Sequence, residues 1–176
     1  RDGRRWMNEA MPFPDMQLHY YRNYSDGSDG YETVFTKQSD LGSSYLLDMA
    51  EIADEYIGAE KYDYHYLVMS DGVYEYYTPG DGDEYLMPWL KNGLYVGQKW
   101  AYDGPYGSIY FKVVGIDKTI QIGNLEFEHC LVLDMDNQAV GWKFRRYYAP
   151  NLGLIYEESP PGGNMTAQLE SWRTIR

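Results

Sequence analysis

The chain has 176 residues, of which 44% are hydrophobic and 24% are charged, and its formal net charge is −12 at pH 7. This length suits one hydrophobic core, and the composition is too apolar for a disordered chain. The excess of acid repels phosphate backbones, which argues against nucleic acid as a partner, and no run reaches the roughly 18 apolar residues of a membrane-spanning helix.

Tyrosine dominates the aromatic residues, with 20 Tyr against 5 Phe and 5 Trp. A ring with a polar tip suits strands that have one wet face, so this content favours β structure without selecting a ligand. The single cysteine, Cys130, excludes an intramolecular disulfide. Its apolar neighbours predict an inert, buried strand residue and not a nucleophile.

Residues 1–15 hold three Arg and two Pro without a period, which indicates an N-terminal arm, and we assign residues 16–176 to a single β-rich domain. Within that domain, Met16–Tyr24 and Tyr31–Lys37 are runs rich in Tyr and β-branched residues. They flank Ser25-Asp-Gly-Ser-Asp-Gly30, whose Asp-Gly steps supply the positive φ angles of a hairpin loop. The sequence therefore predicts a first hairpin here.

The segment from Ser43 to Gly58 fits a helix, with Ser and Gly as caps and apolar residues at helical spacing. The alternative is a strand through Tyr45, Leu47 and Met49, since so short a pattern suits either structure.

Further along the chain, Tyr62–Met69 and Val73–Thr78 flank Ser70-Asp-Gly72 and predict a second hairpin, followed by an irregular connection over residues 86–97. The regular spacing of turn signals beyond it is typical of a meander and not of βαβ units. We thus expect a mainly β fold, a single antiparallel meander sheet with at most one or two short helices. The remaining predicted strands are Lys99–Asp103, Ser108–Asp117, Thr119–Ile122, Leu125–Asp136, Ala139–Tyr148, Leu154–Ser159 and Met165–Thr174.

The hairpin turn near Asp136 and Asn137 allows a prediction of which residues share a face. Because alternate strand residues point to the same side, one face is expected to form the core wall, with His129 and Arg146 at its open end. Such a pair could close an apolar binding mouth or could be edge residues paired to carboxylates. The predicted core face comprises His129, Leu131, Leu133, Trp142, Phe144 and Arg146, and the opposite face Cys130, Val132, Asp134, Lys143 and Arg145.

Three segments occur in a fixed order in the C-terminal half: Gly97-Gln-Lys-Trp100, Gly123-Asn-Leu-Glu-Phe127 and Tyr147-Tyr-Ala-Pro-Asn-Leu-Gly-Leu-Ile155. Over residues 90–176 the chain resembles a family of uncharacterised bacterial lipoprotein and secreted domains. The resemblance implies an antiparallel sheet curved into a half-barrel, as in lipoprotein carriers, and it brings no catalytic residues. Two features depart from the family: a lipobox cysteine is absent, and Asn151 stands where Gly is common.

Candidate metal ligands lie in acidic loops, foremost Asp81, Asp83 and Glu84, for which the alternatives are an irregular calcium site and a solvated turn. The loops of Asp26/Asp29 and Asp134/Asp136/Asn137 also lack the spacing of an EF-hand. His19, His65 and His129 would have to meet in space to bind zinc. No nucleophile motif is present, so no catalytic residue is assigned.

The sequence thus predicts an extracytoplasmic, non-enzymatic module without a cofactor, secreted or anchored to the membrane surface by an upstream segment. We expect a monomer that binds an apolar small molecule or an envelope protein, with His129, Arg146 and Trp142 as candidate ligand-binding residues. The alternatives are a hydrolase acting on cell-wall polysaccharide, which would need two acids facing one cleft, and a purely structural domain.

Overall fold

The structure is a computed structural model that describes residues 15–24, 27–42, 44–53, 61–77, 85–91, 93–105 and 107–174. In these residues the chain forms strands and turns, and no helix is long and apolar enough to cross a membrane. The strands are β1 (Met16–Tyr24), β2 (Gly27–Asp40), β3 (Tyr45–Ala53), β4 (Lys61–Val68), β5 (Gly72–Tyr77), β6 (Tyr85–Lys91), β7 (Lys99–Gly104), β8 (Gly107–Ile122), β9 (Leu125–Asn137), β10 (Trp142–Ala149), β11 (Gly153–Ser159) and β12 (Met165–Thr174).

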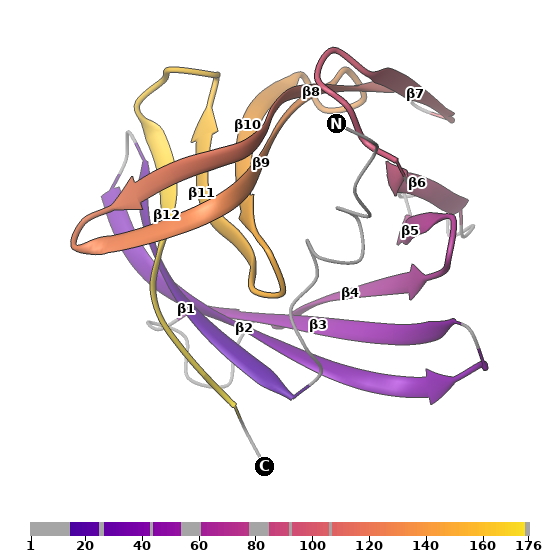
Figure 1. Cartoon of the computed structure of the whole chain (residues 1–176), viewed down its shortest axis with the longest axis horizontal. Coiled ribbons are helices and arrows are strands. Elements are labelled where there is room, and N and C mark those ends of the chain that lie inside the picture. Colours follow the sequence, from indigo (N-terminus) through magenta and orange to yellow (C-terminus); the bar gives the residue numbers. More distant parts are fainter. Residues whose placement is uncertain are drawn as a thin grey trace.

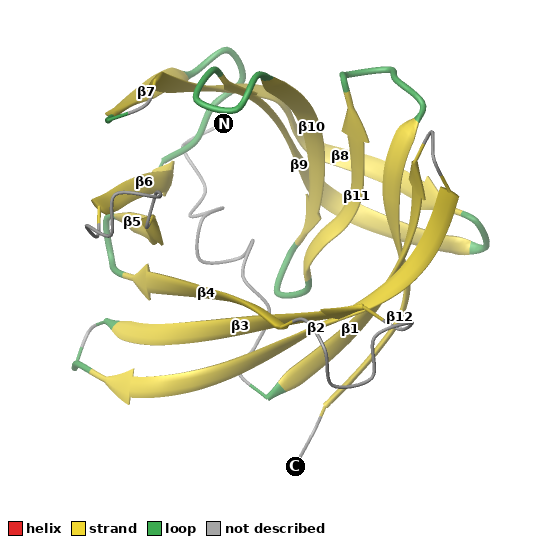
Figure 2. Cartoon of the chain, turned by 180° about the vertical axis from the view of Figure 1, so that it is seen from behind, coloured by secondary structure: helices red, strands yellow, loops and turns green. Residues whose placement is uncertain are grey.

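All of these strands belong to one antiparallel sheet in which nearly every strand pairs with its neighbours in the chain. The exception joins the first strand to the last, because β1 pairs with β12 from Met16 opposite Thr174 to Asn23 opposite Thr166. The edges of the sheet are therefore β6 and β7, which follow one another in the chain and lie near each other (Figure 1). Seen from behind, the strands surround a central space as an almost closed barrel (Figure 2).

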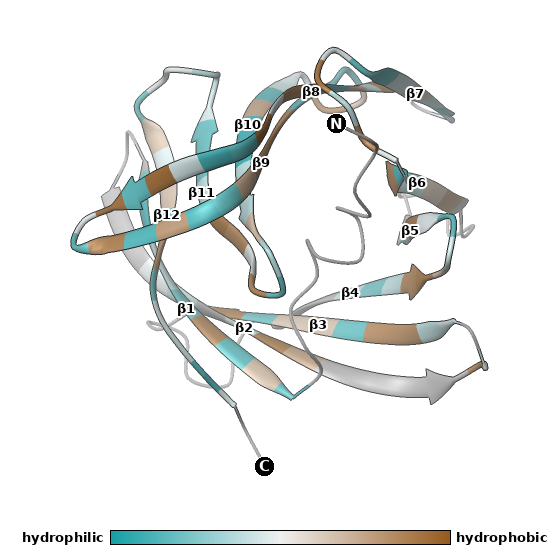
Figure 3. Cartoon of the chain, viewed as in Figure 1, coloured by the Kyte–Doolittle hydropathy of each residue, from teal (hydrophilic) through white to brown (hydrophobic). Residues whose placement is uncertain are grey.

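Alternation along the strands explains why the sheet curves around its apolar side. On β8, Ile109, Phe111 and Val113 are buried, whereas Tyr110 and Lys112 between them are exposed. Bands of opposite hydropathy alternate along β8 and β9 in Figure 3. Because successive strand residues point to opposite faces, each strand contributes one row of side chains to the interior.

The long β8–β9 hairpin departs from this alternation at a pair of bulges. Asp117 and His129 both have positive φ angles, 56° and 59°, and the pairing register shifts around them. A bulge re-aims the chain beyond it. The far end of the hairpin lies over β12, where the rings of Phe127 and Trp172 are 5.8 Å apart.

The structure confirms the mainly β fold, the antiparallel meander and both predicted hairpins. The loop of the first hairpin is shorter than predicted, because residues 27–30, expected in the loop, belong to β2 and pair with β1. The predicted helix at Ser43–Gly58 is wrong, because residues 45–53 form strand β3, as the alternative held; residues 54–60 lie outside the described residues. Strand β6 replaces part of the irregular connection expected at 86–97. The arm expected at residues 1–15 lies outside the described residues except for Asp15.

Candidate ligand-binding cavity

The curved sheet encloses a cavity of about 760 Å³, which is within the range that holds small-molecule ligands. Its lining comes from strands on both halves of the sheet, β1–β6 and β8–β12. On most of these strands the inward-facing residues occur at every second position, as on β1 with Tyr20 and Arg22 and on β4 with Tyr64 and Tyr66. The cavity is therefore a direct product of strand alternation in a sheet that closes on itself.

Aromatic rings form much of the cavity wall. Trp89 on β6 lies between Tyr66 on β4, at 5.3 Å between ring centroids, and Tyr148 on β10, at 5.6 Å in an edge-to-face arrangement. On another side, Tyr20 and Tyr31 stack at 5.0 Å. Such contacts hold the rings in place, so this part of the wall is preorganised.

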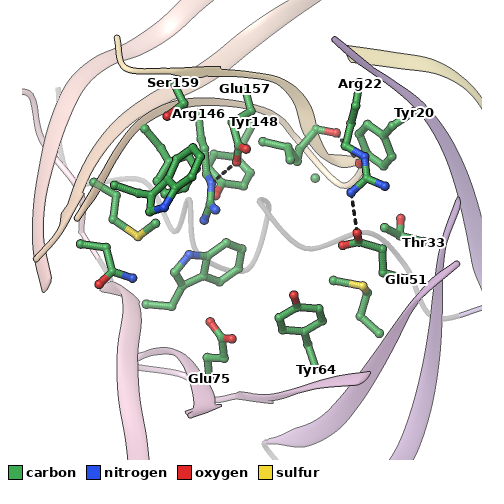
Figure 4. A pocket seen from close by; sticks show the side chains of 18 of the residues that line it. Tyr20, Arg22, Thr33, Glu51, Tyr64, Glu75, Arg146, Tyr148, Glu157 and Ser159 are labelled. Carbon is green, nitrogen blue, oxygen red and sulfur yellow. Dashed lines mark hydrogen bonds and ion pairs between the residues drawn. The ribbon is translucent and has the colours of Figure 1, made fainter. Parts of the chain in front are cut away.

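Two ion pairs are set into the same wall (Figure 4). Arg22 on β1 reaches across β2 to Glu51 on β3, with 2.9 Å between Nη1 and Oε1, and its guanidinium lies 4.0 Å from the centroid of the Tyr31 ring. Arg146 on β10 is paired with Glu157, its cross-strand partner on β11. Each arginine is thus neutralised by its own carboxylate.

Glu75 is the cavity acid that has no such partner. Its cross-strand neighbours are Tyr66 on β4 and Met87 on β6, and among the described residues it makes no hydrogen bond or ion pair. Figure 4 shows its carboxylate pointing into the cavity toward the side that carries Arg146. Burial raises the pKa of Glu75 to about 7, and the positive charge of Arg146 opposes that rise only in part.

Two buried hydroxyl groups in the wall also lack hydrogen bonds of normal geometry. Within the described part of the chain, Thr33 Oγ1 and Tyr148 Oη have no well-aligned hydrogen bond, although Tyr20 lies beside the first and Arg146 beside the second. By contrast, Tyr20 Oη donates to the carbonyl oxygen of Leu154 at 2.6 Å. Buried polar atoms without partners are costly, so these two hydroxyls are available to a bound molecule.

Of the three candidate ligand-binding residues, the structure brings Arg146 and Trp142 to the cavity. Trp142 is 44% exposed and stacks on Phe144, which places it at the rim. His129 does not line this cavity: its side chain is 61% exposed and its Nδ1 lies 3.4 Å from Asp117 Oδ1. The bulge at His129 interrupts the alternation on which the shared face was based.

The candidate metal ligands Asp81, Asp83 and Glu84 lie outside the described residues. In the described ranges no group of three or more His, Cys, Asp or Glu side chains could hold a metal ion. His19, His65 and His129 lie apart, each beside a carboxylate, and Asp134 forms a two-point ion pair with Arg145.

Cys130 is a free, buried thiol, as the sequence predicts. Burial raises the pKa of its thiol to about 11, so the thiolate is scarce at neutral pH.

No protein-family model matches the chain, and no curated protein matches it in sequence. Two solved structures have a similar fold. One is a Bacteroides fragilis protein that is thought to be exported and has a YmcC-like fold: it has 11% identity and a TM-score of 0.54, and the match covers 93% of this chain and 98% of that one. The other is a protein of Parabacteroides distasonis thought to be a lipoprotein, with 12% identity, a TM-score of 0.53 and coverage of 94% and 99%. The chain therefore shares the fold of these two bacterial proteins.

Proposed function

We propose that this protein is a non-enzymatic binding module of the bacterial cell envelope that holds an amphipathic small molecule inside its barrel. The observation that carries the proposal is the cavity of about 760 Å³, which combines an aromatic wall with a few polar groups. Binding sites for small molecules are typically lined in this way, because apolar surface supplies affinity and a few polar groups fix orientation.

The location outside the cytoplasm is supported by the two proteins of similar fold, one thought to be exported and one thought to be a lipoprotein. The proposed ligand is amphipathic, whereas the sequence predicts an apolar one. Ion pairs and an acid within the lining suit a molecule with an apolar body and a polar end, since a wholly apolar ligand would remove solvent from the ion pairs and leave Glu75 without solvent or partner.

One observation favours the hydrolase alternative: Glu75 has the raised pKa that a general acid needs. Glycoside hydrolysis requires a second carboxylate on the reacting bond. The other two acids of the described lining, Glu51 and Glu157, are each held by an arginine. A carboxylate occupied in this way is a weaker base and nucleophile, so binding without catalysis is the better-supported function.

Native mass spectrometry of protein purified without denaturation tests the proposal. We expect a co-purifying small molecule, or a rise in thermal midpoint on addition of decan-1-ol. A bare mass and no thermal shift with any amphiphile would overturn the proposal.

A matched pair of variants assigns binding to the cavity. Thr33→Phe adds a ring where a buried Thr lines the cavity, and Thr119→Phe adds the same ring at an exposed position on β8. Binding should weaken only in Thr33→Phe. Equal binding in both variants would place the ligand elsewhere.

A further inference from the structure

We propose that the ligand of this cavity is an organic cation: an ammonium group on an apolar body, with the positive charge seated beside Glu75 and against the rings of Tyr66 and Trp89. This inference rests on the proposed binding function and specifies the chemical class of its ligand.

The charge balance of the cavity favours a cation. Its charged lining, among the described residues, consists of two arginines and three glutamates. Arg22 is paired with Glu51 and Arg146 with Glu157, which leaves Glu75 as the acid of the described lining without an ion-pair partner. A cation brought into the cavity would neutralise it, whereas an anion would have to compete with a glutamate for one of the arginines.

Glu75 lies beside a row of aromatic rings. Tyr66 is its direct neighbour across the β4–β5 pair, and the Tyr66 ring contacts that of Trp89, which in turn contacts Tyr148. Aromatic faces attract cations through the ring quadrupole, most strongly where water is excluded. Acid and rings together therefore form one wall suited to an ammonium group, and Figure 4 shows Glu75 and Tyr64 rising from the same side of the cavity.

Polar groups of this wall lack well-aligned partners among the described residues. Glu75 does not reach Arg146 closely enough for an ion pair, and the Tyr148 hydroxyl nearby has no hydrogen bond of normal geometry to the described residues. Burial disfavours the charged form of Glu75, which a bound cation would restore. A cation with an apolar body would pair its charge with the carboxylate and cover the rings with its body.

The experiment compares three ligands that share a decyl chain and differ in the polar end: decyltrimethylammonium, decan-1-ol and decanoate. Each is titrated by isothermal calorimetry, the two ionic ligands below their micellar concentrations and decan-1-ol below its solubility limit. We expect decyltrimethylammonium to bind about tenfold more tightly than decan-1-ol, the gain typical of a desolvated cation on an aromatic wall, and decanoate to bind most weakly. Equal binding of the three, or tighter binding of decanoate, would overturn the cation proposal while leaving the binding function intact. Failure of all three to bind would count against both.

Two variants test whether Glu75 causes the preference for the cationic ligand. Glu75→Gln keeps the shape of the side chain and removes its charge, so the preference for decyltrimethylammonium over decan-1-ol should fall to about twofold or less. Glu126→Gln, at an exposed position on β9, is the control and should keep the full preference. A Glu75→Gln protein that retains the tenfold preference would refute the role of this carboxylate.

Discussion

Replacement of Glu75 by Gln should change how the stability of the protein depends on pH. In the folded protein burial raises the pKa of this carboxyl from its ordinary 4.5 to about 7. The native state therefore binds the proton more tightly than the unfolded state does. Since stability falls with rising pH wherever the native state holds more protons, wild-type protein should lose stability from about pH 4.5 to about pH 7 through this group and then level off.

The size of the effect follows from the same values. A difference of about 2.5 pH units, at 1.36 kcal/mol each, amounts to about 3 kcal/mol of destabilisation above pH 7. The groups that face Glu75 are Tyr66 on β4 and Arg146 and Tyr148 on β10, and Met87 on β6 does not titrate. None of these changes charge between pH 4.5 and 8, because burial raises the pKa values of both tyrosines further. The pH dependence can thus be assigned to the glutamate.

Urea unfolding followed by tryptophan fluorescence at pH 4.5, 6, 7 and 8 measures the difference between wild type and Glu75→Gln, in which contributions from other acids cancel. We expect the variant to gain up to about 3 kcal/mol over wild type at pH 8 relative to pH 4.5. Glu126→Gln, exposed on β9, should show no such trend. Parallel stability curves for wild type and Glu75→Gln across the whole range would refute the reasoning.

Three further predictions concern the cavity wall and the core. Arg146→Met leaves the carboxylate of Glu157 without its partner and should cost about 3 kcal/mol in urea unfolding at pH 7, part of which the double variant Arg146→Met/Glu157→Leu should restore; equal stability of single and double variants would show that the pair is not coupled. Leu131→Ala removes a fully buried side chain and should lower the free energy of unfolding by about 3 kcal/mol. Trp142→Ala, at a 44% exposed position, should lower it by less than about 1 kcal/mol. A reversed order would contradict the assignment of these residues to core and rim. The Cys130 thiol, buried and with its pKa raised to about 11, should react with a thiol reagent at pH 8 only at the rate of unfolding, and rapid reaction in native conditions would show that the site opens locally.

Much of the strand order could be predicted because turn chemistry is local. Asp-Gly steps and Gly-Asn steps mark hairpins within a few residues, and the turns at Asp71-Gly72 and Gly123-Asn124 agree with the structure, whereas Asp29-Gly30 lies within β2. The β9–β10 turn shows the limit: its loop covers residues 138–141 and not 136–138, yet Leu133 still pairs with Arg146 on one face. The face assignment holds for the residues paired between β9 and β10, because moving a turn by a whole residue pair preserves the alternation, and it fails at His129, where the bulge interrupts it.

The errors arose where the decisive contacts are remote. Residues 45–53 carry apolar side chains at spacings that fit a helix, but pairing with β2 on one side and β4 on the other imposes a strand. The sequence does not predict Glu75 as a site residue, for a related reason. Its alternation with buried Val73 indicates that it points inward, but nothing local reveals that β5 will face β10 across a cavity.

The pairing of β1 with β12 has a consequence for how the protein folds. Every other pair in the sheet can form by closing a short loop, whereas this one must bring together the two ends of the described chain. Loop-closure entropy makes such a contact slow to form, so β1–β6 and β7–β12 can each grow as local meanders before they dock. The Tyr20–Leu154 hydrogen bond and the contact of Trp89 with Tyr148 both join those halves. If docking of the two halves limits the folding rate, mutations at this junction should slow folding more than they speed unfolding. The cavity, which lies between the halves, would then be the last part of the molecule to acquire its shape.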